Sequence, residues 1–461
     1  MTYFIKVFGC QMNQSDAERI ATFLDKYKFK SASSIDGADL VIFVTCGVRQ
    51  SAEDRVYGQI NNIKKKYSNK KIILTGCLAH IKDVQRRLKD KVDLYFPINN
   101  FQKFGNWIIE NCLEIGNWKL EIPAQKNNSQ RHNSYLSIYP KYTNEYTAFV
   151  PVMTGCNNFC AYCVVPYARG REYSRPAEDI LNEVESLVKK GCKEIVLLGQ
   201  NVNSYLGRDR NSSAEEADMA INFPQLLQQI EKIPGNFWLT FLTSHPKDMS
   251  DELIETIAKS KKICEYISLP VQSGDNGILK KMNRKYSIEH YKKLIKKIRA
   301  EYKRYQPNIF SSISTDIIVG FPGETKKQFE NTANLLRNMK FDMAYIAQYS
   351  PRPQTLAWKL KDNVSKKEKA RREKVLTEIL SKTALANNKK YIGKVIEVLV
   401  DKEIRPHSSA AARSDLFTYL AHTRTQKKVI FSSNKKIPVG NFTKVKITKA
   451  KTFGLKDKYH E

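Results

Sequence analysis

The sequence contains no long apolar run. No window of the 461 residues reaches about 18 uninterrupted apolar side chains, the length that a membrane-spanning helix requires. The start, MTYFIKVFGCQMNQ, also lacks the basic stretch and apolar segment of a secretory signal. These absences exclude an integral membrane protein and predict a folded cytoplasmic protein with no membrane partner.

Acidic residues are scarce relative to basic ones. Asp and Glu total 47 against 77 Lys and Arg, a formal net charge of +30. This excess is larger than solubility requires and favours a polyanionic partner such as nucleic acid. The alternative is a lysine-rich background on solvated surfaces, as in Lys64-Lys65-Lys66, and charge alone does not decide between the two.

Nine cysteines without an export signal argue against a disulfide framework, because cytosolic thiols are kept reduced. Metal ligation or redox chemistry is the first alternative. Cys112, Cys192 and Cys264 fall within or near predicted helices and a strand start, where we expect them to act as buried small apolar residues.

The N-terminal part alternates strand-like and helical segments, which implies a small parallel sheet covered by helices. Cys10, Cys46 and Cys77 directly follow the first three predicted strands, so they are expected to converge at the carboxyl edge of the sheet. The predicted strands are Tyr3–Gly9, Leu40–Thr45, Lys71–Gly76 and Val92–Pro97, and the helices are Ser15–Tyr27, Ser51–Tyr67 and Ile81–Leu88.

The central part repeats a strand–helix unit six times after a polar stretch. This rhythm predicts a partial (βα)6 barrel with its active site at the carboxyl ends of the strands. The predicted strands are Phe149–Gly155, Glu194–Gln200, Trp238–Ser244, Tyr266–Gln272, Ser312–Gly320 and Met343–Ser350. The helices between them include Pro176–Lys190, Phe223–Lys232, Asp251–Ser260, Ile288–Lys303 and Thr325–Met339.

The C-terminal part begins with a basic helix, Ser365–Asn388, and continues in short β-type runs that suggest a small β-barrel. The fold class is therefore α/β, with domains expected at residues 1–117, 146–378 and 379–461 and a linker at 118–145. The last domain is expected to present a cationic face made of Arg413, Arg424, Lys427, Lys428, Lys444 and Lys446.

The sharpest motif is GCNNFCAYC, in which Cys156, Cys160 and Cys163 follow the first barrel strand. Three closely spaced thiolates can hold three irons of a 4Fe-4S cube and leave the fourth iron open. Zinc is the competing metal, but structural zinc takes four protein ligands, and no fourth Cys or His is near in sequence.

GCNNFCAYCVVPYARGREYSRP resembles the radical-SAM (S-adenosylmethionine) methylthiotransferases, and the resemblance extends over essentially the whole chain. FGCQMNQSDAE, VTCGVRQSAEDRVYGQI and LTGCLAH resemble that family's auxiliary-cluster domain. LLGQNVNSY, TSHPKDMSDELI, LPVQSGDNGILKKMNRKY, STDIIVGFPGET and YSPRPQT resemble its radical-SAM domain, and the C-terminal β-barrel is similar to a TRAM domain, an RNA-binding module. GREYSRP, TSHP and LPVQSGD are closest to the MiaB-type tRNA branch.

The resemblance implies two 4Fe-4S clusters. Cys156, Cys160 and Cys163 would hold the cluster that binds SAM, and Cys10, Cys46 and Cys77 the auxiliary cluster that delivers sulfur. The implied reaction is methylthiolation at C2 of N6-isopentenyl-type adenosine at position 37 of tRNA, with one SAM as methyl donor and one as radical source. Such a C–H bond is too weakly acidic for a side-chain base. The implied partners are the tRNA anticodon loop and an electron donor such as flavodoxin or ferredoxin.

Polar residues at the carboxyl ends of the barrel strands are candidate SAM contacts, although such residues are also ordinary turn formers. Arg169, Arg171 and Arg175 could pair with the SAM carboxylate or with RNA phosphate, or form surface ion pairs. The candidate SAM contacts are Tyr162, Arg171, Gln200, Asn201, Asn203, Ser273 and Asp275.

Two residues depart from the family's pattern: Val44 stands where Asn is usual, and Gln354 where Gly is common. The segment 402–415 also fits the TRAM pattern poorly. Two alternative functions stay open at this point. One is the same chemistry on threonylcarbamoyl-adenosine in tRNA or on a ribosomal-protein aspartate, and the other is a non-catalytic, zinc-stabilised RNA-binding protein.

Overall fold

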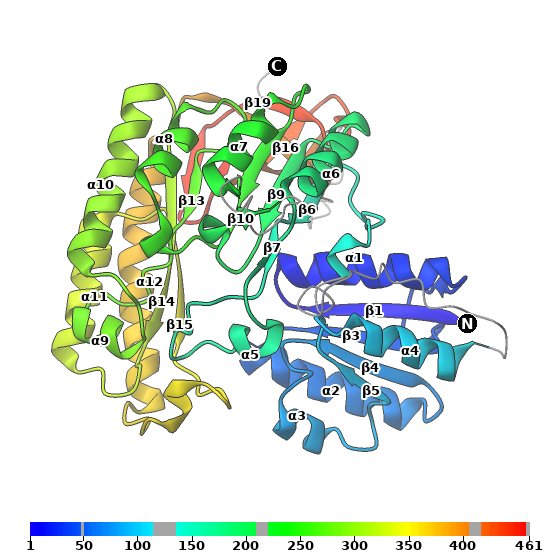
Figure 1. Cartoon of the computed structure of the whole chain (residues 1–461). Coiled ribbons are helices and arrows are strands. Elements are labelled where there is room, and N and C mark those ends of the chain that lie inside the picture. Colours follow the sequence, from blue (N-terminus) through cyan, green and yellow to red (C-terminus); the bar gives the residue numbers. More distant parts are fainter. Residues whose placement is uncertain (48–49, 114–134, 209–219, 405–415, 458–461) are drawn as a thin grey trace.

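The computed structural model describes residues 1–47, 50–113, 135–208, 220–404 and 416–457. Figure 1 shows an N-terminal α/β unit beside a central half-open barrel, with a small C-terminal β-unit at one end of the barrel strands. The α/β fold class and its three parts are as the sequence predicts.

The N-terminal sheet is wholly parallel, with strand order β2-β1-β3-β4-β5. The middle strand β3, of sequence LVIFVT, is buried throughout because helices cover both faces of the sheet. The strands are β1 Thr2–Phe8, β2 Lys30–Ser31, β3 Leu40–Thr45, β4 Lys71–Gly76 and β5 Leu94–Phe96. The helices are α1 Gln11–Lys26, α2 Gln50–Lys66, α3 Lys82–Arg87 and α4 Phe101–Cys112.

The barrel consists of two three-stranded parallel sheets, β6-β9-β12 and β13-β14-β15. A parallel bridge between Leu239 and Ile263 joins them, so that the six strands follow one another in chain order as predicted. The strands are β6 Thr147–Pro151, β9 Glu194–Leu198, β12 Trp238–Phe241, β13 Tyr266–Ser268, β14 Ser312–Val319 and β15 Met343–Gln348. The helices between them are α6 Ala177–Lys189, α7 Phe223–Lys232, α8 Asp251–Lys259, α10 Ile288–Tyr305 and α11 Lys326–Met339.

Several short elements accompany the barrel, and apart from β7, which lies within the predicted strand Phe149–Gly155, they were not predicted. They are β7 Met153–Thr154, α5 Val165–Arg169, β8 Tyr173–Ser174, β10 Leu206–Gly207, β11 Ile221–Asn222 and α9 Asn276–Lys281. Of these, α5 follows the cysteine motif and lies between the N-terminal unit and the barrel (Figure 1).

The long helix α12 (Lys366–Lys389) connects the barrel to the C-terminal unit. It buries Leu376, Leu380 and Ala384 in the barrel core. The following sheet has the order β19-β16-β17-β18-β21-β20 and its own apolar core. Its strands are β16 Val395–Glu403, β17 Phe417–Thr423, β18 Lys428–Ser433, β19 Phe442–Lys446, β20 Lys449–Lys451 and β21 Gly454–Lys456.

The C-terminal unit docks on the amino ends of the barrel strands through two cations, half-buried Arg424 and buried Lys427. Arg424 Nη2 lies 2.8 Å from Glu265 Oε1, just before β13, and Lys427 Nζ lies 2.8 Å from Asp342 Oδ1, just before β15. The expectation that both belong to an exposed cationic face is therefore wrong, because carboxylates of the barrel neutralise them. Of the other expected residues, Lys428, Lys444 and Lys446 are exposed, and Arg413 lies outside the described residues.

His422 adds a third ionic contact at this interface. Its Nδ1 is 2.7 Å from Asp401 Oδ1 and its Nε2 is 3.4 Å from Glu194 Oε2. Burial opposes the charged ring, but hydrogen bonds to these two carboxylates outweigh it and raise the pKa of His422 to about 10.

Because this pKa is raised, the free energy of unfolding is expected to fall as the pH rises into the alkaline range. The unfolded chain has a histidine pKa of about 6.5, so the contribution of charged His422 is complete below about pH 6.5 and is lost as the pH rises toward about 10. We expect His422→Gln to lose less stability than the parent between about pH 6 and about pH 9, measured by urea unfolding. An equally steep loss in both proteins would contradict this assignment.

Candidate active site

Three cysteines meet at the carboxyl edge of the N-terminal sheet. The amide of Cys46 donates to Phe8 O at 2.8 Å and that of Cys77 to Thr45 O at 2.8 Å, so both continue the parallel ladder. Cys10 stands at the N-cap of α1. Asn13 connects it to the other two, because its Nδ2 donates to Thr45 O at 3.4 Å and its Oδ1 accepts from the Cys10 amide at 3.3 Å. The structure therefore brings these cysteines together as expected.

The second cysteine set lies on the loop after β7. Gly155 enters this loop with φ +75°, and a Cβ there would lie 2.0 Å from Arg171 O, so no larger residue fits. The segment before α10 holds the loop from outside. The Ala161 amide donates to Met282 O at 2.9 Å, and Asn283 Nδ2 donates to Phe159 O at 2.9 Å.

The two cysteine sets are adjacent. A Cβ built on Gly47 would lie 3.1 Å from Cys77 Cβ and 3.3 Å from Val164 Cγ2, so the backbone after Cys46 fits between Cys77 and the residue that follows Cys163. Burial raises the pKa of the Cys163 thiol, and charges on nearby Cys160, Cys156 and Cys77 raise it further. A bound metal would stabilise the thiolate form of such a buried thiol.

No three His, Cys, Asp or Glu side chains in the described ranges converge on a point where one metal ion could bind. Ligands of a 4Fe-4S cube do not need to converge in this way, because each cysteine binds a different iron. The donor chemistry of both sets, three thiols on adjoining backbone loops, fits such a cube.

Buried ion pairs fix the two loops relative to each other. Arg169, at the end of α5, lies 2.5 Å from Asp16 on α1, and both side chains are at most 3% exposed. Glu183 on α6 receives Arg175 at 2.6 Å and Arg19 of α1 at 3.5 Å. Arg169 and Arg175 thus form ion pairs, but in the interior, whereas the alternative expected from the sequence was a surface pair.

Polar side chains after β9 have unsatisfied buried acceptors. Among the described residues there is no hydrogen-bond partner for Gln200 Oε1, Asn201 Oδ1 or Asn203 Oδ1. Ser244 Oγ, which follows β12, also has none. The Asn201 side chain is held by its Nδ2, which donates to Asp248 Oδ2 at 2.7 Å. Unpaired buried acceptors cost about 1–3 kcal/mol each, so this set fits a bound polar molecule such as SAM.

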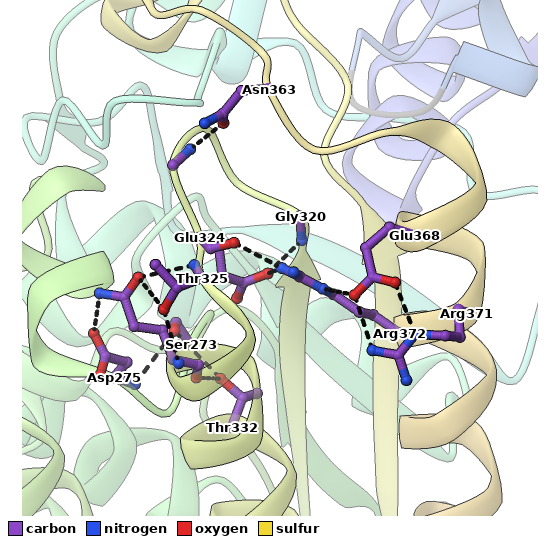
Figure 2. Close-up of polar contacts among 12 residues, drawn as sticks. Ser273, Asp275, Gly320, Glu324, Thr325, Thr332, Asn363, Glu368, Arg371 and Arg372 are labelled. Carbon is purple, nitrogen blue, oxygen red and sulfur yellow. Dashed lines mark hydrogen bonds and ion pairs between the residues drawn. The ribbon is translucent and has the colours of Figure 1, made fainter.

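Ser273 and Asp275 are engaged inside the protein instead, as Figure 2 shows. Asp275 caps α9 by accepting from the Ile278 amide at 3.1 Å, and it also accepts from Gln328 Nε2 at 3.0 Å. Ser273 Oγ lies 3.4 Å from Thr332 Oγ1 on α11.

The remaining two candidates lie on the cysteine loop. Arg171 is exposed and stacks over the Phe159 ring at 4.6 Å. Tyr162 is half-buried and packs against a small apolar cluster that includes Phe321 and Tyr349.

Sequence reasoning missed two buried basic residues near the second cysteine set. Arg284 Nη1 lies 3.5 Å from Cys160 Sγ, and the His245 ring packs 5.6 Å from that of Tyr286. Burial, with the charges of Arg284 and Lys247, lowers the pKa of His245 to about 2, so the ring stays neutral. Both residues stand in motifs quoted for the family resemblance, TSHP and KKMNRKY, which were the available signal.

None of the helices among the described residues is both long and apolar enough to cross a bilayer.

Comparison with protein families matches residues 150–336 to the radical SAM superfamily, residues 2–96 to "Uncharacterized protein family UPF0004" and residues 389–456 to the TRAM domain. The solved structure of the radical S-adenosylmethionine methyltransferase TsrM from Kitasatospora setae, with cobalamin and a [4Fe-4S] cluster bound, has a TM-score of 0.51 at 13% identity. The alignment covers 77% of this chain and 73% of that one. This likeness concerns the fold.

Two curated relatives are similar over nearly the whole chain, and both are named tRNA-2-methylthio-N(6)-dimethylallyladenosine synthase. The protein of Clostridium botulinum (strain Hall) is 40% identical, with 98% of this chain and 96% of the relative covered. That of Thermoanaerobacter pseudethanolicus is also 40% identical, covering 98% and 91%. The chain therefore belongs to the family of tRNA-2-methylthio-N(6)-dimethylallyladenosine synthases, within the radical SAM superfamily.

Proposed function

We propose that this protein is a tRNA methylthiotransferase that replaces the C2 hydrogen of N6-isopentenyl-type adenosine at position 37 with a methylthio group. The observation that carries the proposal is the adjacency of two three-cysteine sets, in which Gly47 lies against both Cys77 and Val164. A sulfur-insertion reaction needs its sulfur source and its SAM site close together, because both act on the same carbon. The names of the relatives support the same reaction.

Each part of the chain has a defined role in this proposal. Cys156, Cys160 and Cys163 hold the SAM-binding 4Fe-4S cluster, and Cys10, Cys46 and Cys77 hold the auxiliary cluster. When bound, the clusters and SAM supply the one-electron chemistry, the sulfur and the methyl group. The protein orients these groups: α1 and α5 fix one cysteine loop against the other, and the barrel walls exclude water.

The unsatisfied acceptors after β9 are proposed to bind SAM. Gln200→Leu removes one acceptor and is expected to raise the Kd for SAM about threefold to tenfold. Equilibrium dialysis with anaerobically reconstituted protein measures this. The control is Gln228→Leu on α7, where Nε2 donates to Thr256 Oγ1 at 3.2 Å, away from the strand ends. Equal Kd values for the two variants would contradict the proposed contact.

The C-terminal unit is proposed to hold tRNA so that its anticodon loop reaches the cysteine loops. Lys428, Lys444 and Lys446 are exposed on this unit, and phosphate contacts of this kind give binding that weakens with salt. A flavodoxin or ferredoxin is the proposed electron donor.

Mass spectrometry of tRNA nucleosides from a strain that lacks this gene tests the function. The isopentenyl adenosine is expected to lack its methylthio group in the deletion strain and to regain it when the intact gene returns. Loss of the methylthio group from threonylcarbamoyl-adenosine instead would assign the alternative substrate, and unchanged tRNA would contradict the proposal.

A further inference from the structure

A buried guanidinium lies against the second cysteine loop without a carboxylate partner. Arg284 is 8% exposed, and its Nη1 is 3.5 Å from Cys160 Sγ. Its Nη2 donates to Pro270 O at 2.8 Å, and its Nε donates to the Tyr286 hydroxyl at 2.9 Å. Among residues that the structure describes, no Asp or Glu forms an ion pair with it.

The other buried arginines in the described part of the chain each face a carboxylate. Arg169 faces Asp16, Arg175 faces Glu183, and Arg372 faces Glu324, the last pair drawn in Figure 2. A buried cation is costly unless an opposite charge and hydrogen bonds compensate it. Arg284 has hydrogen-bond partners, but none of these carboxylates faces it, so its positive charge has no carboxylate to compensate it.

Of the two side chains that hydrogen-bond to Arg284, Cys160 can supply this charge as a thiolate. The other side chain bonded to Arg284 is the Tyr286 hydroxyl, and it is occupied in donating to Val271 O at 2.8 Å. The guanidinium is also held in place, because Arg284 directly follows Met282 and Asn283, which hydrogen-bond to the cysteine loop.

We propose that Arg284 is a positioning residue whose charge compensates the SAM-binding cluster and raises the cluster's reduction potential through a hydrogen bond to the Cys160 sulfur. This inference rests on the proposed function, which places a 4Fe-4S cluster on that loop. Adding an electron makes the cluster more negative, so a fixed positive charge in a dry site stabilises the reduced form. Charge and hydrogen bonds to the sulfurs are among the factors that set such potentials.

The test is a redox titration followed by electron paramagnetic resonance. The full-length protein carries Cys10, Cys46 and Cys77→Ala, so that the SAM-binding cluster alone is titrated. Arg284→Met is expected to lower the reduced-to-oxidised ratio at a fixed applied potential about tenfold, which is about 59 mV for one electron. Arg284→Lys keeps the charge without the planar fork and is expected to lie between Arg284→Met and the parent.

Arg337→Met is the control. It removes an exposed guanidinium of α11 that pairs with Glu330, away from the cysteine loops, and is expected to leave the potential unchanged. A parent-like potential in Arg284→Met with full iron content would overturn the inference. If Arg284→Met loses iron, Arg284→Gln is titrated beside Arg284→Lys, and equal potentials in those two would overturn it. Absence of any iron–sulfur signal in the parent would instead overturn the proposed function.

Discussion

Replacing Cys10, Cys46 and Cys77 with alanine is expected to abolish methylthiolation of tRNA while the protein still cleaves SAM. The reason is that these cysteines follow β1, β3 and β4 in the N-terminal domain, whereas the SAM-binding loop belongs to the barrel. Anaerobic assays that measure 5'-deoxyadenosine and modified tRNA in the same reaction separate the two activities. Cleavage is expected within about threefold of the parent, and methylthiolation below detection, because an entire cluster is missing.

Cys112→Ala is the control for this triple substitution. Cys112 is a half-buried thiol at the end of α4 in the same domain, where Lys71 Nζ lies 3.9 Å from its sulfur. It is expected to leave both activities unchanged. Full methylthiolation by the triple variant would contradict the role assigned to the N-terminal cysteines.

Arg169→Met is expected to destabilise the protein by about 3–5 kcal/mol, because it leaves the Asp16 carboxylate buried and unpaired. Burial disfavours the charged guanidinium, but Asp16 outweighs this and raises the pKa of Arg169, so the pair is ionised in the folded protein. The effect is measured by urea unfolding of the protein without its clusters.

Arg337→Met provides the comparison at the surface. Arg337 lies 2.6 Å from Glu330, but the two side chains are about half exposed, and such pairs contribute about 0–1 kcal/mol. The loss of stability in Arg169→Met is expected to be several times larger than in Arg337→Met. Equal losses in the two variants would show that the Asp16–Arg169 pair does not lock the domains.

Periodicity and turn signals were sufficient to predict most of the regular structure. All six barrel strands appear near their expected bounds, and α7 begins and ends at the predicted residues. The sequence did not reveal β2, α4, β20 or β21. Three of these are two- or three-residue strands, too short for a periodic pattern, and FQKFGNWIIENC in α4 carries a central glycine, which lowers helix propensity.

The segment expected as a linker contributes to the N-terminal core. Tyr135 is fully buried and Leu136 is 3% exposed there, next to α1 and α4. The residues before them, 114–134, lie outside the described ranges. A polar stretch without periodicity gives no indication of which core its scattered apolar residues join, so composition alone could not place Tyr135 and Leu136.

The N-terminal cysteine set was predictable because parallel strands bring their carboxyl ends to one edge of the sheet. The second set was predictable because its three cysteines lie close together in the motif GCNNFCAYC. Long-range pairings were not predictable. Asp16 and Arg169 are 153 positions apart, and no local pattern indicates which carboxylate meets which arginine. The family's preference for glycine where Gln354 stands does have a visible cause, since Gln354 adopts φ +71°, a conformation that favours glycine.

Iron and sulfide counting after anaerobic reconstitution tests the two-cluster site most directly. The intact protein is expected to bind about eight irons with matching sulfide, and a Cys156, Cys160 and Cys163→Ala variant about four. That result would establish one cluster on each cysteine set. Zinc without sulfide in the intact protein would contradict the account and leave an RNA-binding protein stabilised by zinc.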